Sequence, residues 1–347
     1  MLMLIISGFF ILMGLIQVFA TWHISSRNLM YIGMFSILSY GYYRKRKQRA
    51  DGKETPASED KKSLKLAFFV AIIILVPTGI IGHRNRVECA DIKHYETAID
   101  ACTTLISFGE QSGEVFNYRG AAYLNAGMYD RGIEDFDSAL RLEPNGTMTL
   151  VLRGNAYLLK GQYDNAMGNF DKALNTISAL DGAPNFKAHS TDKAKATVLF
   201  VRGMTKFYSI SPLASIDDFA TAVKLDSTDS FKVIWLHLAR IRSGQDDNQE
   251  LEHNSSMVLA DKWPAPIINL YRGKATLEEV LAKAKIGNDY MKADQACDAN
   301  FYVAEFYLQR GMKDEARYLF QAAAKTCHKG NVELGFAGNE LKTMVVE

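Results

Sequence analysis

Two stretches of the chain decide its fold: GAAYLNAGMYDRGIEDFDSALRL at Gly120–Leu142 and GNAYLLKGQYDNAMGNFDKALNT at Gly154–Thr176. They align without a gap at a spacing of 34 residues. Each begins with a glycine, has a tyrosine three residues later, and carries a phenylalanine and an alanine near its end. A period of this length is typical of stacked helical hairpins, because one hairpin cannot bury its apolar face alone. We therefore expect an all-α solenoid.

The spacing of small and aromatic residues matches the tetratricopeptide repeat (TPR), a unit of about 34 residues. Small residues let two antiparallel helices approach closely, and aromatic rings fill the space between hairpins. Such units are predicted at residues 79–112, 113–146, 147–180, 196–229, 230–263 and 297–330. The polar insert SALDGAPNFKAHSTD interrupts the array, and short helices are expected over 264–296. A helix near Val332–Met344 is predicted to cap the stack.

Three apolar stretches precede the repeats and predict a membrane anchor. Residues 1–21 and 65–82 each suit one helical span. Residues 29–43 are shorter; we favour a span there, and a re-entrant or interfacial segment is the alternative. A cleaved secretory signal is the alternative for the first stretch, which lacks a basic start. The predicted architecture is a TPR superhelical solenoid at 83–347 preceded by two or three transmembrane helices within 1–82.

The charge distribution predicts the side of the membrane on which the repeats lie. Residues 1–65 hold ten basic and four acidic residues, about +6, whereas residues 87–347 carry about −7. The basic linker at 44–64 is expected to stay in the cytoplasm by the positive-inside rule. The repeats then lie on the far side, in a periplasm-like space. Their mildly acidic charge argues against a nucleic-acid partner.

The four cysteines form two pairs, each within one predicted hairpin. Cys297 is expected to open the first helix of its unit and Cys327 to end the second, where antiparallel helices bring the two together. Cys89 and Cys102 face the same interior. Two disulfides would agree with an oxidising compartment, and buried free thiols are the alternative.

The sequence lacks the common catalytic motifs, such as GxSxG, HExxH, a Walker loop and GxGxxG. The cysteines and the seven histidines show no spacing typical of a metal site. His237 and Trp235 are predicted to be core residues. We therefore expect no enzyme, no cofactor and no metal, although an unrecognised hydrolase stays open.

A TPR stack offers a concave groove lined by its first helices. The groove residues predicted to bind a peptide are Asn117, Leu124, Asn125, Val151, Asn155, Leu158, Phe200, Met204 and Phe207. Amides can pair with a peptide backbone while apolar surface receives its side chains. The alternative for each residue is packing against the insert or a neighbouring helix. The groove lacks the Lys and Arg side chains that capture of an acidic chain end would need.

The C-terminal part resembles the NlpI-type TPR lipoproteins of the bacterial envelope. The resemblance is carried by WPAPIINLYRGKATLEEVL at Trp263–Leu281 and NFYVAEFYLQRGMKDEARYLFQAAA at Asn300–Ala324. It implies a periplasmic adaptor that binds envelope hydrolases or proteases and can form homodimers. The chain departs from that family because it has no lipobox cysteine near its start; its first cysteine is Cys89.

Together these features predict a scaffold, anchored in the lipid bilayer of a bacterial inner membrane, that binds proteins or peptides on the periplasmic side. The alternative is a membrane sensor or transport-associated subunit in which the TPR domain is accessory. The sequence shows no acidic residue inside the apolar stretches, which argues against ion or proton transport.

Overall fold

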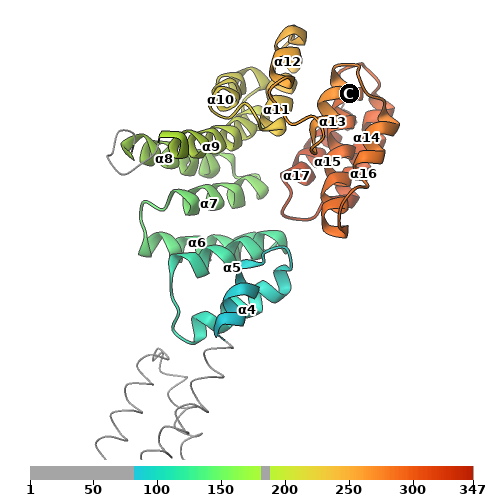
Figure 1. Ribbon diagram of the computed structural model, residues 1–347. Coiled ribbons are helices and arrows are strands. Elements are labelled where there is room, and N and C mark those ends of the chain that lie inside the picture. Colours follow the sequence, from blue (N-terminus) through green and yellow to red (C-terminus); the bar gives the residue numbers. More distant parts are fainter. Residues whose placement is uncertain (1–81, 181–187, 347) are drawn as a thin grey trace, which may run out of the picture. The chain divides into compact units, whose positions relative to one another are not determined.

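The structure is a computed structural model that describes residues 82–180 and 188–346. All regular elements in these two ranges are helices (Figure 1). The chain divides into two compact units, one up to Arg119 and one from Gly120. The predicted spans at 1–21, 29–43 and 65–82 fall outside the described residues, apart from Gly82. Among the described residues, no helix combines the length and apolarity needed to cross a bilayer.

The first unit contains helical residues 82–90, α4 (Tyr95–Ser107) and the beginning of α5 (Gly113–Asn125). Its small core joins Ala101, Leu105 and Val115 around a disulfide. That disulfide links Cys89 to Cys102, whose α-carbons are 4.8 Å apart. With so little apolar surface to bury, the covalent link is a main stabilising element of this unit.

The second unit continues as a series of helical hairpins. Its helices are α6 (Tyr129–Leu142), α7 (Thr147–Leu159), α8 (Tyr163–Leu180), α9 (Ala188–Ser209), α10 (Pro212–Leu225), α11 (Ser230–Arg242), α12 (Asn248–Ser255), α13 (Ala265–Tyr271), α14 (Leu277–Lys283), α15 (Asp289–Leu308), α16 (Lys313–Thr326) and α17 (Val332–Val346). Within hairpins α7 packs on α8, α9 on α10 and α15 on α16. Between hairpins α6 packs on α7, α8 on α9 and α10 on α11. This alternation of contacts gives an all-α, TPR-like solenoid.

Small residues opposite aromatic rings set the separation of the two helices in a hairpin. A Cβ atom added to Gly120 would come within 2.6 Å of the Phe136 ring, and one added to Gly203 within 2.7 Å of the Phe219 ring. Both rings are fully buried. The repeated glycine and phenylalanine of the sequence therefore pack against each other: the glycine of one helix leaves room for the phenylalanine ring of the other.

Several helices begin at residues whose side chains cap them. The Ser211 hydroxyl accepts a hydrogen bond from the Ala214 N–H at the start of α10, and the Asn288 amide oxygen accepts one from the Met291 N–H at the start of α15. Such caps satisfy N–H groups that have no partner within the helix. Gly161, at φ +72°, ends the α7 segment in the left-handed region that glycine favours.

Two helix boundaries differ from those expected. Because Asn288 caps α15, that helix begins eight residues before Cys297, which lies inside the helix rather than opening it. The bond to Cys327 nevertheless forms, with α-carbons 4.7 Å apart, because Cys327 directly follows α16. Helix α9 begins at Ala188 rather than near residue 196, so it takes up part of the polar insert.

Candidate functional site

The nine residues predicted to line a groove do not form an open surface in the structure. Asn117, Asn125, Asn155 and Phe200 are half-buried, whereas Leu124, Val151, Leu158, Met204 and Phe207 are buried. The five apolar side chains belong to the core or lie beneath other helices, which is the alternative that the sequence left open for them. Whether the set binds a peptide stays a prediction.

Helix α17 lies against α7, α9 and α11, and of the predicted groove residues it adjoins Leu158. We define the inner face as Leu158 and Leu159 of α7, Tyr208 of α9, and Trp235 and Arg242 of α11. Phe336 of α17 stacks on Tyr208 with ring centroids 4.1 Å apart, and its ring meets Trp235 edge-on at 5.5 Å. Leu158 and Leu159 line a cavity of about 220 Å³ together with residues of α17. The helix that was expected to cap the stack therefore also covers its inner face.

A buried ion network holds the middle of α17. An Arg242 Nη2 atom lies 2.9 Å from carboxylate oxygens of both Glu305 and Glu340, which come from α15 and α17. Burial raises the pKa of Glu305 to about 7, against the opposing effect of the Arg242 charge. Burial lowers the pKa of Arg242, but the two carboxylates outweigh it, and the net shift is upward. One guanidinium thus joins three helices.

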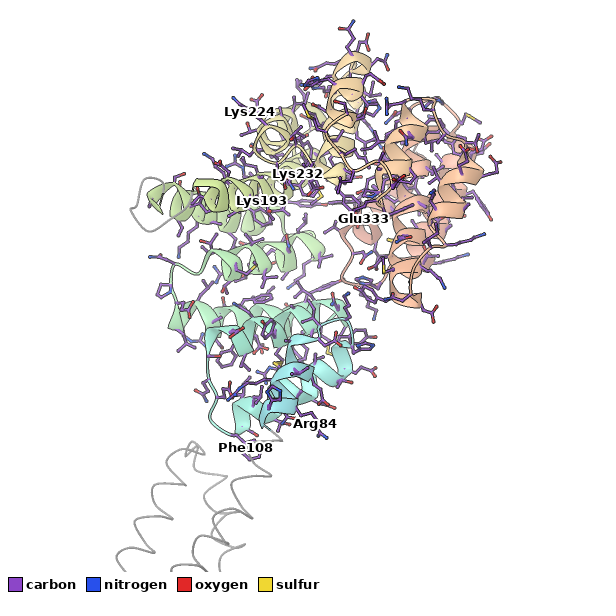
Figure 2. All side chains as sticks on the ribbon, viewed as in Figure 1. Arg84, Phe108, Lys193, Lys224, Lys232 and Glu333 are labelled. Carbon is purple, nitrogen blue, oxygen red and sulfur yellow. A yellow bond between two sulfur atoms is a disulfide. The ribbon has the colours of Figure 1, made fainter. Side chains whose placement is uncertain are left out.

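A second polar cluster lies at the beginning of α17, where Glu333 is labelled in Figure 2. The Trp235 indole N–H donates to the Tyr302 hydroxyl at 2.9 Å, and that hydroxyl donates to a Glu333 oxygen at 3.0 Å. Beside it, the Trp263 indole N–H donates to Asp298 at 2.8 Å. Burial raises the pKa of Asp298 to about 8 and also raises the pKa of Glu333. Asp298 is therefore held largely in the neutral form at pH 7, and the pKa of Glu333 is shifted in the same direction.

These acids lie close to Cys297, but the group is a poor metal site. Donor atoms of Cys297, Asp298 and Glu333 lie within 4.8 Å of one another. Cys297 is bonded to Cys327 and cannot act as a thiolate ligand. The two carboxyl groups are already bonded to Trp263 and Tyr302. The arrangement fixes the position of α17 rather than presenting open ligands.

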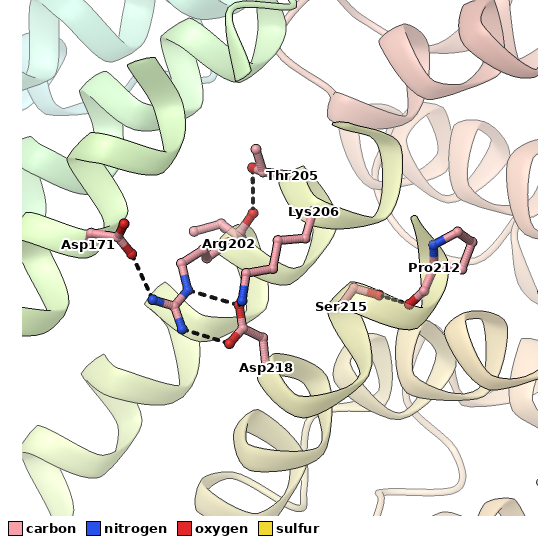
Figure 3. Close-up of polar contacts among 8 residues, drawn as sticks. Asp171, Arg202, Thr205, Lys206, Pro212, Ser215 and Asp218 are labelled. Carbon is pink, nitrogen blue, oxygen red and sulfur yellow. Dashed lines mark hydrogen bonds and ion pairs between the residues drawn. The ribbon is translucent and has the colours of Figure 1, made fainter. Parts of the chain in front are cut away.

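Three arginines each tie a hairpin to the preceding one, and this feature was missed in the sequence. Arg202 of α9 donates to Asp218 of α10 at 2.7 and 2.9 Å and to Asp171 of α8 at 2.7 Å, as Figure 3 shows. Arg153 does the same with Asn169 and Asp137. Arg202 and Arg153 occupy position 7 of their repeats, as Arg119 does, and Arg119 contacts Thr103. That recurrence is visible in the sequence and could have predicted the contacts.

His237 and Trp235 lie in the core, as expected. Trp235 is 1% exposed, and the His237 ring is hydrogen-bonded through Nδ1 to Asp247 at 2.9 Å. Asp247 also accepts from Arg240 at 3.0 Å. The pairing of a histidine with an aspartate occurs in hydrolases, but this pair lies inside the packing of α11 and α12, where a substrate has no access.

No protein-family model matches the chain. Among solved structures it is similar to YrrB, a TPR protein described as having an unusual peptide-binding site: 15% identity over 70% of this chain and 100% of that one, with a TM-score of 0.34. It is also similar to a TPR protein from Parabacteroides merdae, with 12% identity over 76% and 99% of the two chains and a TM-score of 0.42. A third is the C-terminal part of a TPR repeat-containing protein from Cytophaga hutchinsonii, with 16% identity over 75% and 99% and a TM-score of 0.27. These likenesses concern the fold alone, and the resemblance to NlpI-type lipoproteins stays a prediction.

Proposed function

We propose that the chain is a scaffold, without catalytic activity of its own, that binds another protein through the inner face. The observation that carries this proposal is that the inner face already holds an α-helix. The Phe336 ring of α17 stacks on Tyr208, and the Glu340 carboxylate of the same helix pairs with Arg242. An amphipathic helix laid into a groove is a recurring mode of peptide recognition.

The acids with raised pKa values belong to the packing of the helices rather than to an open active site. Groups of this kind also occur in active sites. Here, however, Asp298, Glu333 and Glu305 are buried, and each is bonded to a tryptophan, a tyrosine or an arginine. Their observed role is to hold α15 and α17 in place.

We further propose that residues 1–82 hold the scaffold in a bacterial inner membrane and that residues 83–347 lie in the periplasm. Support comes from the apolar stretches and the basic linker at 44–64. The two disulfides add support, since such bonds persist in oxidising compartments. The partners proposed, from the resemblance to NlpI-type proteins, are envelope hydrolases or proteases, and a homodimer belongs to the same proposal.

A membrane sensor or transport-associated subunit with an accessory TPR domain is the second candidate. It is favoured by the share of the sequence given to the apolar stretches within 1–82. Deletion of residues 1–82 separates the two functions. A scaffold keeps its partner after the deletion, whereas a membrane subunit with accessory repeats loses it.

The scaffold function can be tested by site-specific photo-crosslinking in cells. A photoreactive amino acid at Leu159 of the inner face, or at Asn155 one turn earlier in α7, should crosslink one and the same polypeptide; both residues are half-buried. The matched control is Lys172, which is exposed on the second helix of a hairpin. Mass spectrometry identifies the crosslinked protein. Crosslinks from Lys172 to the same polypeptide, or none from the two α7 positions, would reject binding through the inner face.

A further inference from the structure

The buried side of α17 carries acidic groups as well as apolar ones. Its buried positions are Glu333, Phe336, Ala337 and Glu340. Their spacing is that of a single helix face. Burying a carboxyl group is unfavourable, and even a good partner offsets only part of that loss. Four further apolar side chains of α17 are only partly buried against the core: Val332, Leu334, Leu341 and Met344. The helix is therefore held by apolar packing together with a few specific polar contacts.

Two glycines weaken α17 without improving its packing. Gly335 and Gly338 lie within the helix, and a Cβ atom added at either would meet no atom within 4 Å. Neither has the positive φ that only glycine adopts readily. Inside a helix, glycine in place of alanine shifts the equilibrium away from the helix by about fivefold. Alanine would fit at both positions, so the packing gives no reason for this weakness.

The segment that leads into α17 is attached to the rest of the unit by a covalent bond. Just before the helix, Cys327 is bonded to Cys297, and the Lys329 carbonyl accepts a hydrogen bond from the Tyr129 hydroxyl at 2.7 Å. If α17 leaves the inner face, these contacts keep it close by. A tethered helix of this kind competes as a local ligand at high effective concentration.

We infer that α17 is a built-in and replaceable ligand of the inner face, and that the natural partner displaces it with a helix of the same chemistry. This inference rests on the proposed scaffold function and names the partner class. The partner's helix carries an aromatic side chain, which Tyr208 and Trp235 receive, and an acidic side chain four residues later, which pairs with Arg242. Phe336 and Glu340 occupy those positions in the closed chain.

The test uses the full chain in detergent and a fluorescein-labelled peptide of residues 332–346 as the probe. Fluorescence anisotropy measures the affinity of three chains: the natural one, Phe336→Ala, and the double variant Gly335→Ala/Gly338→Ala. Loosening α17 with Phe336→Ala should strengthen peptide binding at least tenfold. Stabilising α17 with two alanines should weaken peptide binding by about 25-fold, because the peptide binds only the fraction of chains in which α17 has left the inner face.

Two controls make the experiment specific. Peptides with Phe336→Ala or Glu340→Gln should bind the loosened chain at least tenfold more weakly than the natural peptide. Hydrogen exchange should show faster exchange of α17 amides in the Phe336→Ala chain and unchanged exchange in α7. The double alanine variant removes no buried side chain and so creates no cavity. Its result is therefore valid even if Phe336→Ala disturbs folding.

Equal affinity of all three chains would overturn the inference, because α17 would not compete for the inner face, while the scaffold function would survive. If the peptide does not bind the Phe336→Ala chain although the α17 amides exchange fast, both the inference about α17 and the proposed binding through the inner face would be overturned. If light scattering shows that the Phe336→Ala chain is a dimer and its α17 amides are protected from exchange, a second copy of the chain occupies the inner face. That result would overturn the inferred class of partner.

Discussion

At the scale of single residues, the contact between glycine and phenylalanine decides how closely two helices of a hairpin approach. Gly154 faces the Phe170 ring even more closely than Gly120 faces Phe136. Gly154→Ala should therefore destabilise the fold by about 1–3 kcal/mol, because overpacking outweighs the better helix propensity of alanine. Denaturant unfolding followed by circular dichroism measures the change.

Gly168 provides the matched control for this substitution. It lies in α8, and a Cβ atom added there would meet no atom within 4 Å. Gly168→Ala should stabilise the protein by up to about 1 kcal/mol. The same sign of change at Gly154 and Gly168 would show that the close approach to Phe170 is not what requires glycine.

Asp298 should make the stability of the second unit depend on pH. Burial raises its pKa to about 8 in the folded chain, far above its ordinary value of 3.8. The stabilising contribution is therefore complete below about pH 4 and is lost as the pH rises to about 8. Asp298→Asn keeps an acceptor for Trp263 and cannot ionise, so its melting temperature should fall less between pH 5 and 8.

The magnitude expected for this effect is on the order of a few kcal/mol. Glu333 and Glu305, whose pKa values are also raised, leave part of the pH dependence in place. Asp294, which pairs with His328 at 3.1 Å, faces the same cluster. A pH profile of Asp298→Asn parallel to that of the natural chain would show that Asp298 ionises normally in the folded state.

At the scale of helices, Arg202 joins α8, α9 and α10. Arg202→Ala leaves Asp218, 4% exposed, with only the Lys206 ammonium at 2.9 Å. The loss should be about 2–4 kcal/mol. The double variant with Asp218→Ala should lose less than the sum of the single changes, by about 1–3 kcal/mol.

An exposed ion pair is the control for the Arg202 substitution. Lys292 and Asp289 lie 3.4 Å apart on the surface of α15. Lys292→Ala should change the stability by less than about 0.5 kcal/mol. Additive effects of Arg202→Ala and Asp218→Ala would mean that the contact between the two side chains does not stabilise the array.

The hairpins could be predicted from the sequence because their packing rule is periodic. Gly120 and Gly154 recur at a spacing of 34, together with the aromatic residues that face them. The docking of α17 could not be predicted in this way. Its buried face includes Glu333 and Glu340, which a hydrophobic pattern assigns to solvent, and their partners Tyr302 and Arg242 are distant in sequence. For the same reason the repeat pattern did not reveal that α17 adjoins the predicted groove residue Leu158.

At the scale of the whole molecule, both units contain a disulfide. If the repeats lie in the periplasm, a membrane-impermeant thiol reagent should label no cysteine of intact cells. When the outer membrane is opened, the inner membrane is kept intact and a membrane-impermeant reductant is added first, the thiol reagent should label all four cysteines. Mass spectrometry counts the labels. Labelling only after the inner membrane is broken would place the repeats in the cytoplasm.

The distance in sequence between the inner face and its cover has a consequence for biosynthesis. The inner face is complete at Arg242, whereas α17 begins at Val332, 90 residues later. At about 5–20 residues per second, roughly 5–20 s separate the two on a ribosome. During that interval the nascent chain exposes Tyr208 and Trp235 to chaperones and to any waiting client. Assembly with a partner is then favoured while the polypeptide is still emerging, before its own helix can dock.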